Sequence, residues 1–169
     1  MMTYLIGGLL MSNQLYNTKM ELGLHCLFIL NELYPEFCGL DRLLYLDYLS
    51  LYIEDFKADT VNLHPKYPFQ SIEIMEKRKI LKNSLFDLAY KGLIDVDIYG
   101  GLSYGGNANT LWLVDSMQNI YSSHLKENIA LVIQEMRLKT DKELKTIIFN
   151  NKIDEQNVFN NFYPYSEEV

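Results

Sequence analysis

Residues 70–106 read QSIEIMEKRKILKNSLFDLAYKGLIDVDIYGGLSYGG, and this stretch decides the predicted fold. Its first part has apolar residues at helical spacing and predicts a helix that begins at Gln70 or Ser71 and ends before Gly92. That apolar seam consists of Ile74, Leu81, Leu85 and Leu88. Its second part alternates apolar and acidic residues from Ile94 to Ile98, and then Gly100-Gly101 supplies a turn before a return strand. Helices followed directly by such a β-hairpin are typical of a winged helix.

Two further helices are predicted before this stretch. The Thr18–Glu21 segment has the spacing of a capping box, and the apolar period after it predicts a helix that Pro35 closes. A second helix is predicted from Asp41, as its N-cap, to about Ile53. Residues 54–69 have no apolar period and contain two prolines, so we expect a long connection over the surface.

The region after the hairpin is predicted to be helical. Residues 108–118 suit either a short helix or another strand, and the helix is preferred. An amphipathic helix is predicted from Ser122 or Ser123 to Lys139, and a capping box at Thr140 predicts a last short helix. The predicted fold class is therefore mainly α with a small β-hairpin, a winged-helix-like body with additional C-terminal helices.

The predicted division of the chain has three parts. Residues 1–15 form an N-terminal extension, residues 16–139 the winged-helix-like body, and residues 140–169 a short helix with an aromatic, acidic tail. The 169 residues, nearly half of them apolar, suit one core. The tail aromatics are candidates for binding a partner: Phe159, Phe162, Tyr163 and Tyr165. The apolar run near the start is too short to span a bilayer, and a cytoplasmic location is expected.

The charge distribution argues against a surface that binds nucleic acid along its length. The formal charge is -7 and the isoelectric point is near 4.9, whereas phosphate binding needs clustered basic residues. One local cluster lies on the predicted third helix and is a candidate for contact with DNA or a partner: Lys77, Arg78, Lys79 and Lys82. Residues 70–92 nevertheless carry a net charge of only +2, which favours a solvated or partner-facing surface.

The search for catalytic chemistry gives no candidate residues. None of the histidines, His25, His64 and His124, has a second ligand-type residue at a spacing typical of zinc sites. No Walker-type phosphate loop is present. Cys26 and Cys38 are interpreted as reduced thiols, although one disulfide bridge is open to them in an oxidising compartment. We therefore expect no enzyme activity, no metal and no cofactor.

The order of several short motifs resembles a known family. These motifs are Tyr16-Asn17-Thr18 with Glu21-Leu22-Gly23, Leu40-Asp41-Arg42-Leu43-Leu44 through Asp47-Tyr48-Leu49, Leu63-His64-Pro65, and Pro68. Over about residues 16–136 the chain resembles the middle component of ABC-three-component systems, the small accessory subunit of Lamassu-type anti-phage defence. The resemblance implies an adaptor that bridges an SMC/Rad50-like ATPase and a nuclease-type effector, and that restrains the effector until activation. It transfers no catalytic residues to this chain.

The main alternative is a free-standing winged-helix transcriptional regulator. That class predicts a homodimer whose DNA binding depends on salt and on the basic residues of the third helix. The adaptor class instead predicts contacts with partner proteins through the late amphipathic helix, the connection at residues 54–69, and the aromatic tail.

Overall fold

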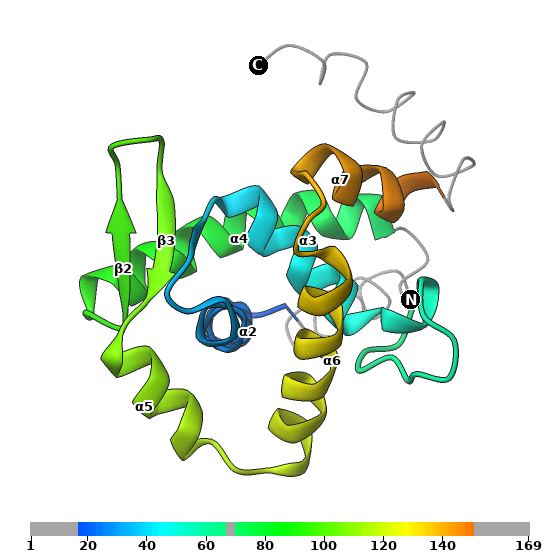
Figure 1. The fold of residues 1–169 in the computed structure, drawn as a ribbon, viewed down its shortest axis with the longest axis horizontal. Helices are drawn as coiled ribbons and strands as arrows, with labels where there is room; N and C mark the ends of the chain where they lie inside the picture. The colour runs from blue at the N-terminus through cyan, green and yellow to red at the C-terminus, as the bar shows by residue number, and fades with distance from the viewer. Residues whose placement is uncertain (1–16, 67–69, 151–169) are drawn as a thin grey trace, which may run out of the picture.

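The computed structural model describes residues 17–66 and 70–150, and in these residues the chain is mainly helical with one small antiparallel sheet (Figure 1). The helices are α2 (Lys19–Leu33), α3 (Leu40–Leu51), α4 (Gln70–Tyr90), α5 (Ala108–Ser116), α6 (Ile120–Met136) and α7 (Asp141–Asn150). The strands are β1 (Phe37–Cys38), β2 (Ile94–Asp97) and β3 (Ser103–Gly106). The predicted fold class, mainly α with a small β element, is confirmed.

Helix α2 lies at the centre of the molecule, where Figure 1 shows it end-on with the other elements around it. Its N-cap is Thr18, whose hydroxyl accepts a hydrogen bond from the backbone N–H of Glu21 at 3.1 Å, as the capping pattern predicted. Most of its residues are buried, because α4, α5, α6 and β3 all pack against it. A helix that is apolar on nearly all sides is a core helix.

The predicted hairpin is confirmed, and a third strand joins it. Strands β2 and β3 pair antiparallel, and β1 pairs with the other edge of β3, where Phe37 lies opposite Gly105. The last two residues of β3 are Gly105 and Gly106. A Cβ atom at Gly105 would lie 2.7 Å from the Phe37 ring, and one at Gly106 would lie 2.9 Å from the carbonyl oxygen of Leu30. These glycines therefore let β3 approach β1 and α2 closely.

The predicted start of α3 is wrong by a few residues. Gly39 is the N-cap and makes no side-chain capping bond, while Asp41 lies in the first turn. The Asp41 carboxylate instead accepts a hydrogen bond from Nε of Arg78 at 2.7 Å. The helix ends at Leu51, and a short 3-10 helix follows at Ile53–Asp55. Asp41 therefore does not cap α3. Its carboxylate instead forms an ion pair with Arg78 of α4.

The helices after the sheet agree with the predictions. Residues 108–116 form a helix, which decides between the two alternatives for that segment, and Asn107 caps it in a capping box with Thr110. Helix α6 begins slightly earlier than predicted, because Asn119 is its N-cap. The Thr140 hydroxyl and Glu143 form the predicted capping box before α7.

Two parts of the predicted division lie outside the described residues, namely the N-terminal extension and the aromatic tail. The order of helices followed by a hairpin is that of a winged helix, and the winged-helix assignment itself stays a prediction. No helix within residues 17–66 and 70–150 has an apolar run long enough to cross a lipid bilayer.

Candidate functional site

A group of polar side chains, most of them buried, lies where α2, α3, α4 and the start of α6 meet. We call this group the polar cluster. It consists of Glu21, His25, Asp47, Tyr52, His64, Glu73, Lys77 and Tyr121. Buried polar groups are stable only when they are paired, so the contacts within this cluster matter to the fold as well as to any function.

His25, on α2, contacts both parts of the polar cluster, namely the part that contains Asp47 and Lys77 and the part that contains Glu21 and His64. Its side chain is 2% exposed, and its Nδ1 lies 2.7 Å from Oδ1 of Asp47 on α3. Since a carboxylate only accepts hydrogen bonds, Nδ1 is the donor in this contact, and Nε2 lies on the opposite side of the ring, away from Asp47. That Nε2 lies 3.0 Å from the hydroxyl oxygen of Tyr121 on α6.

The half of the cluster nearer α4 is a buried ion-pair network. The Lys77 ammonium is 1% exposed and lies 3.4 Å from Asp47 and 3.4 Å from Glu73, which stands four positions earlier on the same helix. Burial alone would raise the pKa of the Asp47 carboxyl, but Lys77 and His25 outweigh burial and hold that pKa at about 2. The Tyr52 hydroxyl donates to Glu73 at 3.0 Å, and burial together with this carboxylate raises the pKa of Tyr52.

The other half brings two histidines to one carboxylate. Nε2 of His64 lies 3.2 Å from Oε1 of Glu21, and Nε2 of His25 lies 4.0 Å from the same oxygen. Burial opposes the charge on Glu21, yet the hydrogen bond from His64 and the nearby His25 lower the pKa of this carboxyl below its usual value. One ligand-type atom from each of these three side chains lies within 4.8 Å of the others. In the described part of the chain, this is the group suited to holding a metal ion.

The basic cluster predicted on the third helix is divided between the inside and the outside of the molecule. The structure places Lys77 in the polar cluster, so it cannot reach DNA or a partner. Arg78 is partly exposed and paired with Asp41. Lys79 and Lys82 are exposed. The four tail aromatics lie outside the described residues.

Lys79 and Lys82 belong to an exposed stripe along α4. This outer stripe consists of Met75, Lys79, Lys82, Phe86 and Tyr90. Successive members are three or four positions apart, so they share one helix face. Phe86 is 72% exposed and Tyr90 is 87% exposed. Adjacent large exposed apolar side chains with basic neighbours are typical of a surface that contacts another protein.

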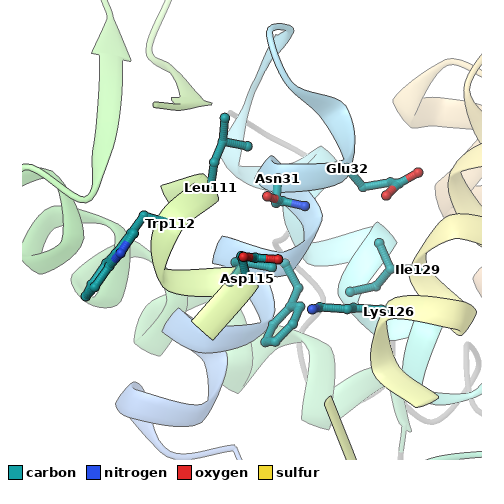
Figure 2. Close-up of a pocket in the computed structure, with 9 residues that line it drawn as sticks. Asn31, Glu32, Leu111, Trp112, Asp115, Lys126 and Ile129 are labelled. Atoms are coloured by element: carbon teal, nitrogen blue, oxygen red, sulfur yellow. The ribbon is translucent and has the colours of Figure 1, made fainter. Parts of the chain in front are cut away.

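A surface cavity of about 530 Å³ lies between α2, α5 and α6 (Figure 2). Asn31, Glu32, Asp115 and Lys126 line it, and Figure 2 shows Trp112 extending away from these side chains. The Lys126 ammonium lies 5.6 Å from the centre of the Phe28 ring beneath it. The cavity has no pairing of a nucleophile with a base, and we assign it no chemistry.

Neither cysteine is placed to act as a nucleophile. Cys26 and Cys38 are both buried and free. Burial raises the pKa of the Cys26 thiol, and it raises that of Cys38 to about 12. Because the thiolate is the reactive form, both groups are unreactive at neutral pH.

The sequence contained one overlooked signal for the polar cluster. Glu21 and His25 are four positions apart, which places them on one face of a helix, but the search for zinc-type spacing did not pair them. The family motifs also contain Asp47 and His64, whose sequence positions do not indicate that they lie near Glu21 and His25. Their meeting depends on how α3 and the connection before α4 pack onto α2.

Fold and site together define a small, mainly helical protein whose polar interior ties four segments together. The model of the ABC-three component (ABC-3C) system Middle Component 2 family matches residues 15–157, which is most of the chain. The chain therefore belongs to this family, and the resemblance to the middle component of ABC-three-component systems is confirmed. As the middle component of a three-component system, it has partner subunits. No curated protein and no solved structure matches the chain.

Proposed function

We propose that this chain is the non-catalytic accessory subunit of a bacterial anti-phage defence complex. In this proposal it bridges an SMC/Rad50-like ATPase and a nuclease-type effector in the cytoplasm, and it restrains the effector until the ATPase engages foreign or broken DNA. The observation that carries the proposal is the family match over residues 15–157. Lamassu-type operons are the setting that the sequence motifs favour.

The described residues support a role in binding rather than in catalysis. The two thiols are buried and protonated at neutral pH, and the carboxylate of Asp47 is committed to Lys77 and His25. The outer stripe of α4, by contrast, leaves Phe86 and Tyr90 in contact with solvent. Burying two such aromatics against a partner gives a favourable contribution from the apolar area removed from water. We propose the outer stripe as a contact surface for a partner subunit.

A co-purification from the three-gene operon tests this function. With an affinity tag on the ATPase, we expect the wild-type chain and the effector to be retained together. Phe86→Asp combined with Tyr90→Asp should reduce retention of the chain at least tenfold, because the charged side chains cannot be buried at the contact. Leu138→Asp is the matched control, since Leu138 is exposed beyond the end of α6 and not on α4.

Three outcomes overturn parts of the proposal. If the wild-type chain binds neither the ATPase nor the effector, the accessory role fails. If the double variant and Leu138→Asp behave alike, the outer stripe is not the contact surface. Effector activity that is the same with and without this chain removes the restraining role.

The competing function, a transcriptional regulator, has one structural observation in its favour. Lys79 and Lys82 are exposed on α4, the helix that would enter a major groove in a winged helix. A regulator would be a homodimer that binds a palindromic DNA site, with affinity that falls steeply with salt and on Lys79→Ala with Lys82→Ala. If the purified chain shows this behaviour, the regulator replaces the accessory subunit as the assigned function.

A further inference from the structure

We propose that Glu21, His25 and His64 bind one Zn²⁺ ion, with the Tyr121 hydroxyl next to it. This proposal does not depend on the accessory role, and it assigns to the polar cluster a ligand as well as a structural purpose. The three side chains come from α2 and from the connection before α4, and Tyr121 comes from α6. A bound ion would therefore fasten three segments at one point.

The spacing of the ligand atoms fits a tetrahedral ion. Bonds of 2.0–2.1 Å in a tetrahedral site place neighbouring ligand atoms roughly 3.3 Å apart. The distance from His64 Nε2 to Glu21 Oε1 is 3.2 Å, and the Tyr121 oxygen lies 3.0 Å from His25 Nε2 and 3.2 Å from His64 Nε2. The 4.0 Å distance from His25 Nε2 to Glu21 Oε1 would have to shorten, and the ligand atoms of Glu21, His25 and His64 all lie within 4.8 Å of one another. The phenol oxygen thus lies near the fourth corner, where it or a water molecule completes the coordination.

The contacts behind the ligands have the form that metal sites use. Nδ1 of His25 donates to the buried carboxylate of Asp47 at 2.7 Å, which fixes the ring and directs the Nε2 lone pair to the site. Such carboxylate–histidine pairs behind a metal ion orient the ring and increase its basicity. The second oxygen of Glu21, Oε2, accepts the backbone N–H of Asn17 at 2.5 Å, so Oε1 is the oxygen turned toward the histidines.

The charge of the cluster favours a divalent cation. Glu21, Asp47 and Glu73 are carboxylates, and in the described residues Lys77 is the only lysine or arginine in ion-pair contact with them. Three carboxylates thus share one ammonium group, and buried carboxylates are stable only when cationic or hydrogen-bonding groups face them. A divalent ion held by Glu21 and the two imidazoles would add positive charge at the side of the cluster away from Lys77. The ligand set of two imidazoles and one carboxylate suits Zn²⁺ better than Mg²⁺ or Ca²⁺, which prefer oxygen ligands.

The two imidazoles of the site are buried, whereas the other two side chains are partly exposed. The side chains of His25 and His64 are 2% and 5% exposed, whereas that of Glu21 is 21% exposed and Tyr121 is 41% exposed. Glu21 and Tyr121 therefore form the side of the site that solvent reaches.

Zinc titration of the full-length chain, stripped of metal with a chelator, tests the proposal. ZnCl₂ is added in competition with a chromophoric chelator, and we expect one Zn²⁺ per chain with a dissociation constant below about 1 μM. His64→Ala should weaken binding at least about 100-fold, and Asp47→Asn about 10- to 100-fold. His124→Ala is the matched control and should bind as the wild type does, because His124 is exposed on α6 and outside the cluster.

Several results would overturn the zinc site. They are wild-type binding weaker than about 10 μM, equal affinities of His64→Ala and His124→Ala, or imidazole nitrogen NMR signals showing His25 and His64 protonated and unchanged by zinc. Circular dichroism checks that each variant folds. Should His64→Ala fail to fold, Glu21→Gln replaces it, and zinc X-ray absorption of the wild-type chain decides independently. Two imidazole ligands support the site, and thiolate or all-oxygen ligands contradict it.

Discussion

The two ends of helix α2 are held in the molecule by different physical means. At its N-terminal end, Glu21 and His25 face the buried charges of the polar cluster. At its C-terminal end, the backbone carbonyl of Leu30 lies against Gly106 of β3, so the contact is close packing without charge. The first end depends on complementary charges that must all be present. The second depends on the absence of a single side-chain atom.

The strongest way to break this balance is to remove the cation at the charged end. Lys77→Met leaves Asp47 and Glu73 buried without their ammonium partner, and we expect the free energy of unfolding to fall by about 3–5 kcal/mol. Lys79→Met is the matched control, two positions along α4 and exposed, with an expected change within about 0.5 kcal/mol. Guanidinium unfolding of both variants measures the difference. A loss below about 1 kcal/mol for Lys77→Met would show that the histidines supply the charge instead.

A smaller change sharpens the description of the charged end. Tyr52→Phe removes the hydroxyl that donates to Glu73, which should cost about 1.5–3 kcal/mol at neutral pH. Because the folded state raises the pKa of Tyr52, this contribution is fully present below pH ~10 and is lost as the unfolded tyrosine ionises at higher pH. The difference in unfolding free energy between wild type and Tyr52→Phe should therefore shrink above pH ~10. A difference that stays constant up to pH ~11 contradicts the assigned contact.

The packed end should respond more weakly. Gly106→Ala places a Cβ 2.9 Å from the Leu30 carbonyl oxygen, so the backbone must shift, and we expect a loss of about 1–2 kcal/mol in unfolding free energy. Gly100→Ala is the control, because a Cβ there meets nothing within 4 Å. Thermal unfolding of both variants makes the comparison. Equal midpoints would mean that β3 does not depend on close contact with α2.

The two ends also differ in how far the sequence predicted them. The hairpin was predictable because alternation in residues 94–98 and the turn glycines are local signals. The short strand β1 was not, since two residues carry no period, and it forms only because β3 offers an edge. The start of α3 was misplaced because an acidic residue in a first turn resembles an N-cap until its partner, Arg78, is known.

The candidate site was hidden for a related reason. The basic cluster was recognisable because its residues are close in sequence. Which of them face the interior could not be predicted, because Lys77 is buried through its contact with Asp47 on another helix, whereas Lys79 is exposed. His64 has no ligand-type neighbour in sequence, and its approach to Glu21 results from the path of the connection after α3. Contacts between distant segments are set by tertiary packing, which local patterns do not encode.

The contact between His25 and Tyr121 joins residues 96 positions apart, and that between His25 and Asp47 joins residues 22 positions apart. Closing such long loops is costly in chain entropy and slows folding. Until α6 has arrived, a partly assembled interior would contain polar groups without all their partners, which is unfavourable. Half-formed structures therefore gain little from collapsing around α2. The polar cluster should therefore make this domain fold in an all-or-none manner. Any conformation in which one of these segments is misplaced leaves buried polar groups unpaired and is unstable relative to the native fold.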